Sequence, residues 1–369
     1  MKYQISIRQF IFLFLFTTIT PLFTYVPQIA AKNAGNGGYI SAIYFWVLLF
    51  IFAALLIRIV KVYPGHSYFE ILSSLISSPL ARIIFFLYGV WAFLMLLYKL
   101  TSYNLLLQTT LMNDTTNYLI LFGLFFIVLY AALKGAKTIF RVAELLYGPL
   151  IIFLVVILIF TLPNINKDFL TPVTENQLLG NVSTIWTLAP LGGNLFFLLF
   201  FLKPITGMNR FPVVRKRILQ SVFVFFLFSY LCIFLTIGLA GATLTSQYSY
   251  SLFQALKCVT FLSSFERFDA IISLVTVLSD FITITFYLVI LMKCFGLAFS
   301  ITNTKEIAVV ALTLACTMVC IMDVSQFSIE HVYRNYIDKI SIAFQYIIPV
   351  LLGIICWFKK PVSANIVDT

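Results

Sequence analysis

Residues 183–205 read STIWTLAPLGGNLFFLLFFLKPI, with Ala189-Pro190-Leu191-Gly192-Gly193 near the centre of the run. The run is long enough to cross a bilayer, which requires roughly 20 apolar residues per helix. Proline lacks a backbone N–H and glycine lacks a side chain, so this helix is predicted to break near mid-membrane. The chain as a whole is 62% hydrophobic and only 10% charged. This composition excludes a soluble globular enzyme and indicates an integral membrane protein.

Similar apolar runs occur along the whole chain of 369 residues, separated by short polar or charged segments. We therefore expect one polytopic, all-α membrane domain over residues 1–369 with about ten transmembrane helices. The predicted spans are 10–31, 39–61, 80–108, 116–134, 139–162, 183–205, 217–243, 267–300, 306–323 and 340–358.

The two halves of the chain resemble one another. Span 1 carries Thr20-Pro21-Leu22 at the position where span 6 carries Ala189-Pro190-Leu191-Gly192-Gly193. With five spans in each half, the second repeat (about 183–358) must cross the membrane in the opposite sense to the first (about 10–162). Discontinuous helices 1 and 6 in a 5+5 inverted repeat are typical of a transporter-type binding site, because helix ends leave backbone groups free. Two ordinary proline kinks are the alternative.

The distribution of Lys and Arg predicts the orientation of these spans. With both termini in the cytoplasm, 17 of the 24 basic residues lie on the inner side and 6 on the outer side, and Lys99 lies within span 3. The net charge of +11 is thereby explained by topology and by contact with anionic lipid. No basic groove for nucleic acid is expected.

Span 8 places polar residues on one helical face, among them Thr276, Asp280, Thr283 and Tyr287. Ionised Asp280 would be costly inside the membrane unless a cation pairs with it. Lys99 of span 3 lies at a comparable depth, so we predict a Lys99–Asp280 pair. The equally weighted alternative is a protonated Asp280, with Lys99 extending toward the outer interface.

Catalytic and metal-binding motifs are lacking in the sequence. The six cysteines form no CxxC pair, the two histidines are isolated in loops, and no phosphate-binding loop occurs. We therefore expect no metal, no cofactor and no enzymatic activity.

Several short segments, in this order and spacing, are similar to the spore germination permease family. These are Lys32-Asn33-Ala34-Gly35 with Tyr39-Ile40-Ser41, Arg141-Val142-Ala143-Glu144, Leu170-Thr171-Pro172-Val173, Tyr250-Ser251-Leu252-Phe253-Gln254 and Phe265-Glu266-Arg267-Phe268-Asp269. The family comprises the membrane-spanning B subunits of nutrient germinant receptors and belongs to the amino acid/polyamine/organocation transporter superfamily.

The resemblance implies a multi-pass protein of the inner spore membrane or cell membrane. It also implies that the protein senses a small germinant, which we expect to be an amino acid. It also implies a complex with an A subunit and a lipoprotein C subunit. The sequence departs from the family where ligand would bind. Thr20-Pro21-Leu22 replaces a Gly-x-Gly break, and Asn194 replaces a glutamate.

Residues near the two predicted breaks and the polar faces of spans 3 and 8 form the candidate binding site. Two other functions stay open: a proton-coupled amino-acid permease and a non-binding scaffold for partner subunits. The candidate residues are Thr20, Pro21, Leu22, Tyr25, Tyr98, Lys99, Tyr103, Gly192, Gly193, Asn194, Thr276, Asp280 and Thr283.

Overall fold

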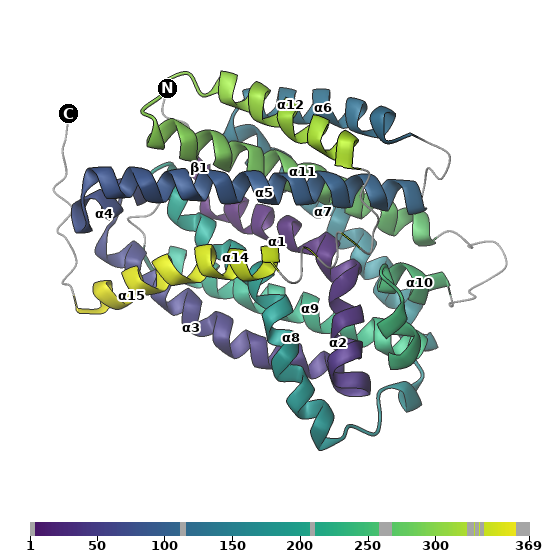
Figure 1. Ribbon diagram of the computed structural model, residues 1–369. Coiled ribbons are helices and arrows are strands. Elements are labelled where there is room, and N and C mark those ends of the chain that lie inside the picture. Colours follow the sequence, from purple (N-terminus) through teal and green to yellow (C-terminus); the bar gives the residue numbers. More distant parts are fainter. Residues whose placement is uncertain are drawn as a thin grey trace.

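The computed structural model describes residues 4–110, 116–206, 211–257, 268–322, 328, 332 and 336–358. The described chain is almost entirely helical, and its long helices pack side by side (Figure 1), as predicted for the all-α class. Phe265-Glu266-Arg267 and both ends of the chain lie outside the described residues.

Each predicted span corresponds to helix in the structure. The first five are α1 (Ile7–Phe23) with α2 (Tyr25–Ala34), α3 (Ser41–Val62), α5 (Ser78–Thr110), α6 (Asn117–Leu133) and α7 (Ala136–Thr161). The second five are α8 (Glu175–Gly193) with η4 (Asn194–Phe201), α9 (Phe211–Gln247), α11 (Phe268–Ala298), α12 (Lys305–Met322), and α14 (Asp338–Ile342) continued by η6 (Ala343–Ile347) and α15 (Ile348–Phe358).

Shorter elements connect these spans. They are β1 (Ile5–Ser6), η1 (Gly35–Ile40), α4 (Tyr68–Leu75), η2 (Leu162–Asn164), η3 (Lys167–Phe169), β2 (Ile205–Thr206) and α10 (Ser251–Lys257).

The length and polarity of the helices suit a bilayer. In the described part of the chain, 8 helical segments are long and apolar enough to span a membrane, and Ile7–Phe23 and Tyr118–Leu133 are shorter apolar helices. The outer face of α6 is apolar, with Tyr118, Leu119 and Phe122 all more than half exposed. Exposed side chains of this kind require lipid rather than water around them. The chain is therefore a multi-pass membrane protein.

Helix α1 lies at the centre of the molecule. Its start is fixed by a capping box, in which Ser6 and Gln9 exchange side-chain to backbone hydrogen bonds of 3.2 and 3.0 Å. All residues from Leu13 to Phe23 are buried, and the helix packs against α7, α9 and α11. Polar groups in this part of α1 therefore face protein on every side.

The break in span 1 is not where the sequence predicted it. Pro21 lies inside α1, which continues through Leu22 to Phe23, and the helical path ends at Thr24 (φ −103°, ψ −97°). From there α2 runs in a different direction (Figure 1). Proline fits the φ of a helix while lacking the N–H, so its position alone does not fix where the winding stops.

Span 6 changes its winding where the sequence predicts a break. Helix α8 passes through Pro190 to Gly193, and the winding then tightens to a 3₁₀ helix from Asn194 to Phe201. Spans 1 and 6 are discontinuous as expected: span 1 is interrupted at Thr24, just beyond the predicted break at Thr20–Leu22, and span 6 changes its winding at Asn194, within the predicted break at Gly192–Asn194. A change of winding alters which backbone groups are paired without opening the helix.

One end of span 1 is joined to one end of span 6 by backbone pairing. Strands β1 and β2 are parallel, with Ile5 opposite Ile205 and Ser6 opposite Thr206. The N–H of Ile5 also donates to the carbonyl of Pro204 at 2.9 Å. The starting end of α1 is therefore fixed beside the end of η4.

Candidate functional site

The break at Thr24 is held by hydrogen bonds from a distant segment. The Thr24 hydroxyl donates to the carbonyl of Thr20 at 2.8 Å, within the last turn of α1. The Thr24 carbonyl accepts from the Ser251 hydroxyl at 2.6 Å and from the Ser251 N–H at 3.3 Å. Thr24 and Ser251 are both buried. The first turn of α10 is thus joined to the break by two hydrogen bonds to one buried carbonyl.

Lys99 and Asp280 form the predicted ion pair. The Lys99 Nζ lies 3.4 Å from Asp280 Oδ1, and the two side chains are 6% and 0% exposed. Asp280 Oδ2 accepts no hydrogen bond from the described residues, although the Thr20 side chain lies beside the carboxylate. The Lys99 ammonium also lies 6.0 Å from the centre of the Tyr98 ring. A buried pair of this kind neutralises two charges that would each be costly alone.

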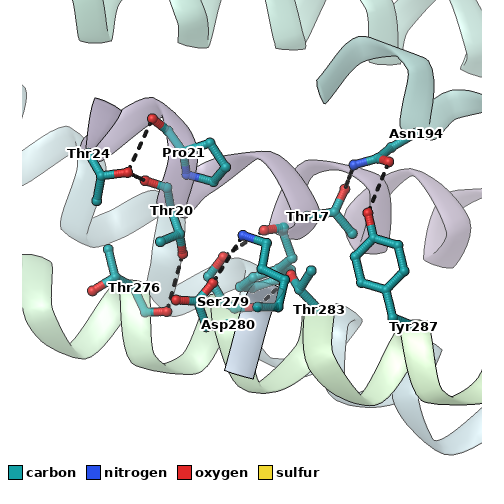
Figure 2. Close-up of polar contacts among 12 residues, drawn as sticks. Thr17, Thr20, Pro21, Thr24, Asn194, Thr276, Ser279, Asp280, Thr283 and Tyr287 are labelled. Carbon is teal, nitrogen blue, oxygen red and sulfur yellow. Dashed lines mark hydrogen bonds and ion pairs between the residues drawn. The ribbon is translucent and has the colours of Figure 1, made fainter. Parts of the chain in front are cut away.

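Helices α1 and α11 are joined by hydrogen bonds along the same face (Figure 2). The Ser279 hydroxyl donates to the carbonyl of Phe16 at 2.6 Å, and the Thr20 hydroxyl donates to the carbonyl of Thr276 at 3.4 Å. These contacts lie on successive turns of α1. They bring the predicted residues Thr20, Thr276 and Asp280 into one polar layer between the two helices.

A second polar cluster surrounds Asn194, the first residue of the 3₁₀ segment of span 6. Its Nδ2 donates to the Thr17 hydroxyl at 3.2 Å, while its Oδ1 accepts from Gln345 Nε2 at 2.9 Å and from the Tyr287 hydroxyl at 3.4 Å. Figure 2 shows the contacts of Asn194 with Thr17 and Tyr287. All four side chains are buried. One carboxamide therefore links side chains from α1, α11 and η6.

The two glycines before Asn194 face different surroundings. An added Cβ on Gly193 would lie 2.3 Å from Gln345 Oε1, whereas one on Gly192 would lie 2.6 Å from the ring of Phe45. The Tyr346 hydroxyl donates to the carbonyl of Ala189 at 2.9 Å, one turn earlier. Gly193 thus belongs to the Asn194 cluster, and Gly192 packs against an apolar side chain of α3.

The predicted site residues divide into two groups. Thr20, Lys99, Gly193, Asn194, Thr276 and Asp280 take part in the two polar clusters, and Tyr98 lies beside Lys99. Thr283 instead donates to the carbonyl of Ser279 in its own helix, at 2.8 Å. Leu22 is buried in the core, Pro21 is helical, and Gly192 is in apolar packing. Tyr25 is partly buried, and Tyr103 is buried close enough to Asp280 to interact with its charge.

Sequence reasoning missed Thr17, Ser279 and Gln345 as members of these clusters. Gln345 is the side chain that reaches Asn194 from span 10. A signal for it existed, because it is a polar amide within an otherwise apolar span, where burial without a partner is costly. Thr17 and Ser279 carried no comparable signal, since hydroxyls in membrane helices commonly bond to their own backbone.

Four of the five segments that carried the family resemblance, those within the described residues, lie around span 1. Besides Ser251 at the Thr24 break, Glu144 accepts a 2.7 Å hydrogen bond from Gln9 and pairs with Arg8. An added Cβ on Gly37 would lie 2.8 Å from Val173. These segments therefore support span 1 and the turn that follows it, rather than contacting the Asn194 cluster.

The segment Lys32-Asn33-Ala34-Gly35 supports the second half of span 1. Gly35 ends α2 with φ of +53°, a conformation that favours glycine. The Asn33 side chain donates to the Thr184 hydroxyl of α8 at 3.3 Å. An added Cβ on Gly180 would lie only 2.0 Å from the Asn33 carbonyl oxygen. Helices α2 and α8 therefore approach each other as closely as their backbones allow.

Comparison with known proteins identifies the family. A family model described as "Spore germination protein" matches residues 4–328. The chain belongs to this family. It is also 24% identical, over 97% of its own length and 96% of the relative's, to Spore germination protein KB of Bacillus subtilis (strain 168).

The fold resembles that of a transporter. Mhp1, a nucleobase-cation-symport-1 family transporter solved in a closed conformation with bromovinylhydantoin bound, superposes with a TM-score of 0.58. The match covers 94% of this chain and 79% of Mhp1 at 12% sequence identity. A sequence identity this low supports a shared fold and says nothing about which ligand this chain binds. The germination family member thus has the transporter-like membrane fold that the broken spans predicted.

The chemistry available at the site is hydrogen bonding and one ion pair. Among the described residues, no group of three His, Cys, Asp or Glu side chains could hold a metal ion. The amide of Asn194 and the charged pair are already engaged with protein partners. A polar ligand would have to replace some of those partners to bind between spans 1 and 6.

Proposed function

We propose that this chain is the germinant-sensing membrane subunit of a spore germinant receptor, and that its ligand is a small nutrient of the amino-acid class. Family membership and the transporter-like fold support this assignment. By the family resemblance, it would act in the inner spore membrane, with both termini cytoplasmic, beside an A subunit and a lipoprotein C subunit. Co-purification of those subunits from spores tests the complex.

The observation that carries the proposal is the position of Asn194. Its carboxamide joins α1, α11 and η6 through three side chains, at the residue where span 6 changes its winding. A ligand with an ammonium and a carboxylate would exchange hydrogen bonds with these groups. Binding would then favour one arrangement of the helices over another, and partner subunits would respond to the shift in population.

Substitution of Gly193 tests this site. The Cβ of any other residue would lie within 2.3 Å of Gln345 Oε1, so Gly193→Leu displaces Gln345 from Asn194. Asn194→Ala removes the shared amide without added bulk. We expect spores with either variant to lose the response to candidate amino acids, measured by the fall in optical density, while the subunit is retained in the membrane.

Gly123→Leu is the matched control, because an added Cβ there would meet nothing within 4 Å. It should leave the germinant response intact. A normal response from both the Gly193→Leu and the Asn194→Ala spores would refute the site.

A proton-coupled permease is the second candidate, favoured by the buried Lys99–Asp280 pair. Intramembrane carboxylates of this kind occur in proton relays. Uptake of an amino acid by vesicles containing only this subunit, driven by a pH gradient, would support the permease. If no ligand changes the thermal stability of the purified subunit, a scaffold that binds nothing is favoured instead.

A further inference from the structure

The basic cleft is the groove between the first turns of α1, the middle of α7 and the start of α9. Its volume is about 860 Å³, within the range of ligand sites. We propose that it binds the headgroup of an anionic phospholipid, whose acyl chain continues along α7 and α9 toward the break in span 1. This proposal is independent of the germinant site.

The rim of the cleft is strongly positive. Arg8, Arg215, Lys216 and Arg217 all line it, and each is exposed. Glu144 pairs with Arg8, but no ion pair within the described residues engages the three basic residues of α9. Within the described part of the chain, the Arg217 side chain donates to the neutral side chain of Gln220, at 3.3 Å. The first turn of α9 contains no acidic residue, and its helix dipole adds positive potential.

The floor of the cleft is apolar. The rings of Phe12 and Tyr147 stack with their centres 3.9 Å apart, and Leu15 lies beside them. Phe223 and Val224 of α9 form the opposite wall, and Phe223 is 53% exposed. A soluble anion would use the rim and leave these side chains uncovered. An amphipathic anion would contact both the basic rim and the apolar floor of the cleft.

A second groove continues from the first along the same helices. It is about 280 Å³, shares Val224 with the basic cleft, and is lined by apolar residues of α7 and α9 as far as Leu235. The distance from Val224 to Leu235 is about 16 Å at the helical rise of 1.5 Å per residue. That matches half of a hydrocarbon core roughly 30 Å thick. The two grooves together therefore fit a headgroup and one acyl chain within a single leaflet.

The far end of the acyl groove touches the break in span 1. Phe23, the last residue of α1, and Leu252, the neighbour of Ser251, both line it. The headgroup end is predicted to face the cytoplasm, where anionic lipids attract basic residues. A lipid in this position would contact both ends of α1.

Binding can be measured on the intact purified protein in detergent. Phosphatidylglycerol should raise the unfolding temperature and be retained in native mass spectrometry, and phosphatidylcholine with the same acyl chains should do neither. The triple variant Arg215→Gln, Lys216→Gln, Arg217→Gln should bind phosphatidylglycerol about tenfold to a hundredfold more weakly, given the contribution of each basic residue near an anionic surface.

Two controls separate this proposal from simpler explanations. The triple variant Arg82→Gln, Lys134→Gln, Lys305→Gln removes the same charge from exposed residues elsewhere and should keep the affinity of the wild type. Leu231→Trp fills the acyl groove and should weaken phosphatidylglycerol binding severalfold with every basic residue in place. Equal binding of both lipids, equal loss in the two triple variants, or full stabilisation by inorganic phosphate alone would each overturn the proposal.

Discussion

The Ser251 hydroxyl donates a 2.6 Å hydrogen bond to the carbonyl oxygen of Thr24, the residue at which span 1 breaks. The Ser251 N–H lies 3.3 Å from the same oxygen, so one residue of α10 supplies two donors to a single buried carbonyl. The shape of span 1 thus depends on a segment from the other half of the chain.

We expect Ser251→Ala to lower the free energy of unfolding by about 0.5–1.5 kcal/mol, the usual net contribution of one hydrogen bond, because the Ser251 N–H still donates to the Thr24 carbonyl. Thermal unfolding of the purified protein in detergent measures the change. Ser183→Ala is the control, because the Ser183 hydroxyl is exposed and bonds only within its own helix. Equal effects of the two substitutions would count against a role for Ser251 at the break.

The Lys99–Asp280 pair should show strong coupling between its members. Either Lys99→Met or Asp280→Asn leaves one buried charge uncompensated, and we expect each to cost about 3–5 kcal/mol of stability. The double variant should be more stable than either single variant, because it buries no charge. A double-mutant cycle by thermal unfolding measures the coupling, and simple additivity would show that the 3.4 Å contact is not an energetic pair.

Gly180 should tolerate no side chain. The atom that an added Cβ would meet at 2.0 Å is the backbone oxygen of Asn33, which no rotamer change can move. We expect Gly180→Ala to cost about 1–3 kcal/mol or more through overpacking. Gly123→Ala is the matched control, because the position has open space around it and the substitution also replaces a glycine within a helix. It should be neutral or stabilising by up to about 1 kcal/mol.

The ion pair between Glu70 and Lys203 should make a small contribution to the free energy of unfolding, and this contribution should depend on pH. Burial raises the pKa of Glu70, but the 2.7 Å hydrogen bond from Lys203 and the bonds from Ser67 outweigh it and hold the pKa below 4.5. A lowered pKa means that the stabilisation is complete above pH 4.5 and is lost as the pH falls through the folded-state value.

We therefore expect Glu70→Gln to be less stable than the wild type by under about 1 kcal/mol at neutral pH, because the pair is largely exposed. The difference should shrink as the pH falls below 4.5 and through the lowered folded-state pKa of Glu70. Unfolding temperatures of both proteins across this range measure it. A difference that does not change with pH would exclude the ion pair as its source.

Much of the fold follows from hydropathy alone. All ten predicted spans correspond to helices, because only long apolar helices satisfy their backbone groups within lipid. Span 6 begins at Glu175 instead of residue 183, because the capping pair Thr174 and Gln177 starts the helix before its apolar portion. Hydropathy locates the membrane segment of a helix and does not locate its cap.

The site was predictable where charge was involved. The sequence predicts a pair of Asp280 and Lys99, with a protonated Asp280 as the alternative, because an isolated charge in a membrane requires a partner; the structure contains the pair. The position of the break was not predictable, since it depends on Ser251, and the contact between Thr24 and Ser251 spans most of the sequence. Gln345 could be recognised as unusual from its sequence context, but its partner Asn194 required the packing of span 10 against span 6.

The short parallel pairing of Ile5–Ser6 with Ile205–Thr206 limits how the two discontinuous spans can move. Because the backbone ladder joins them at one end, α1 and η4 cannot slide past each other without losing it. Rotation about that end preserves the ladder and produces its largest displacement at the opposite end of α1, where Thr24 lies. In such a rotation the strand pair stays in place, and the residues around Thr24 and Ser251 move the farthest.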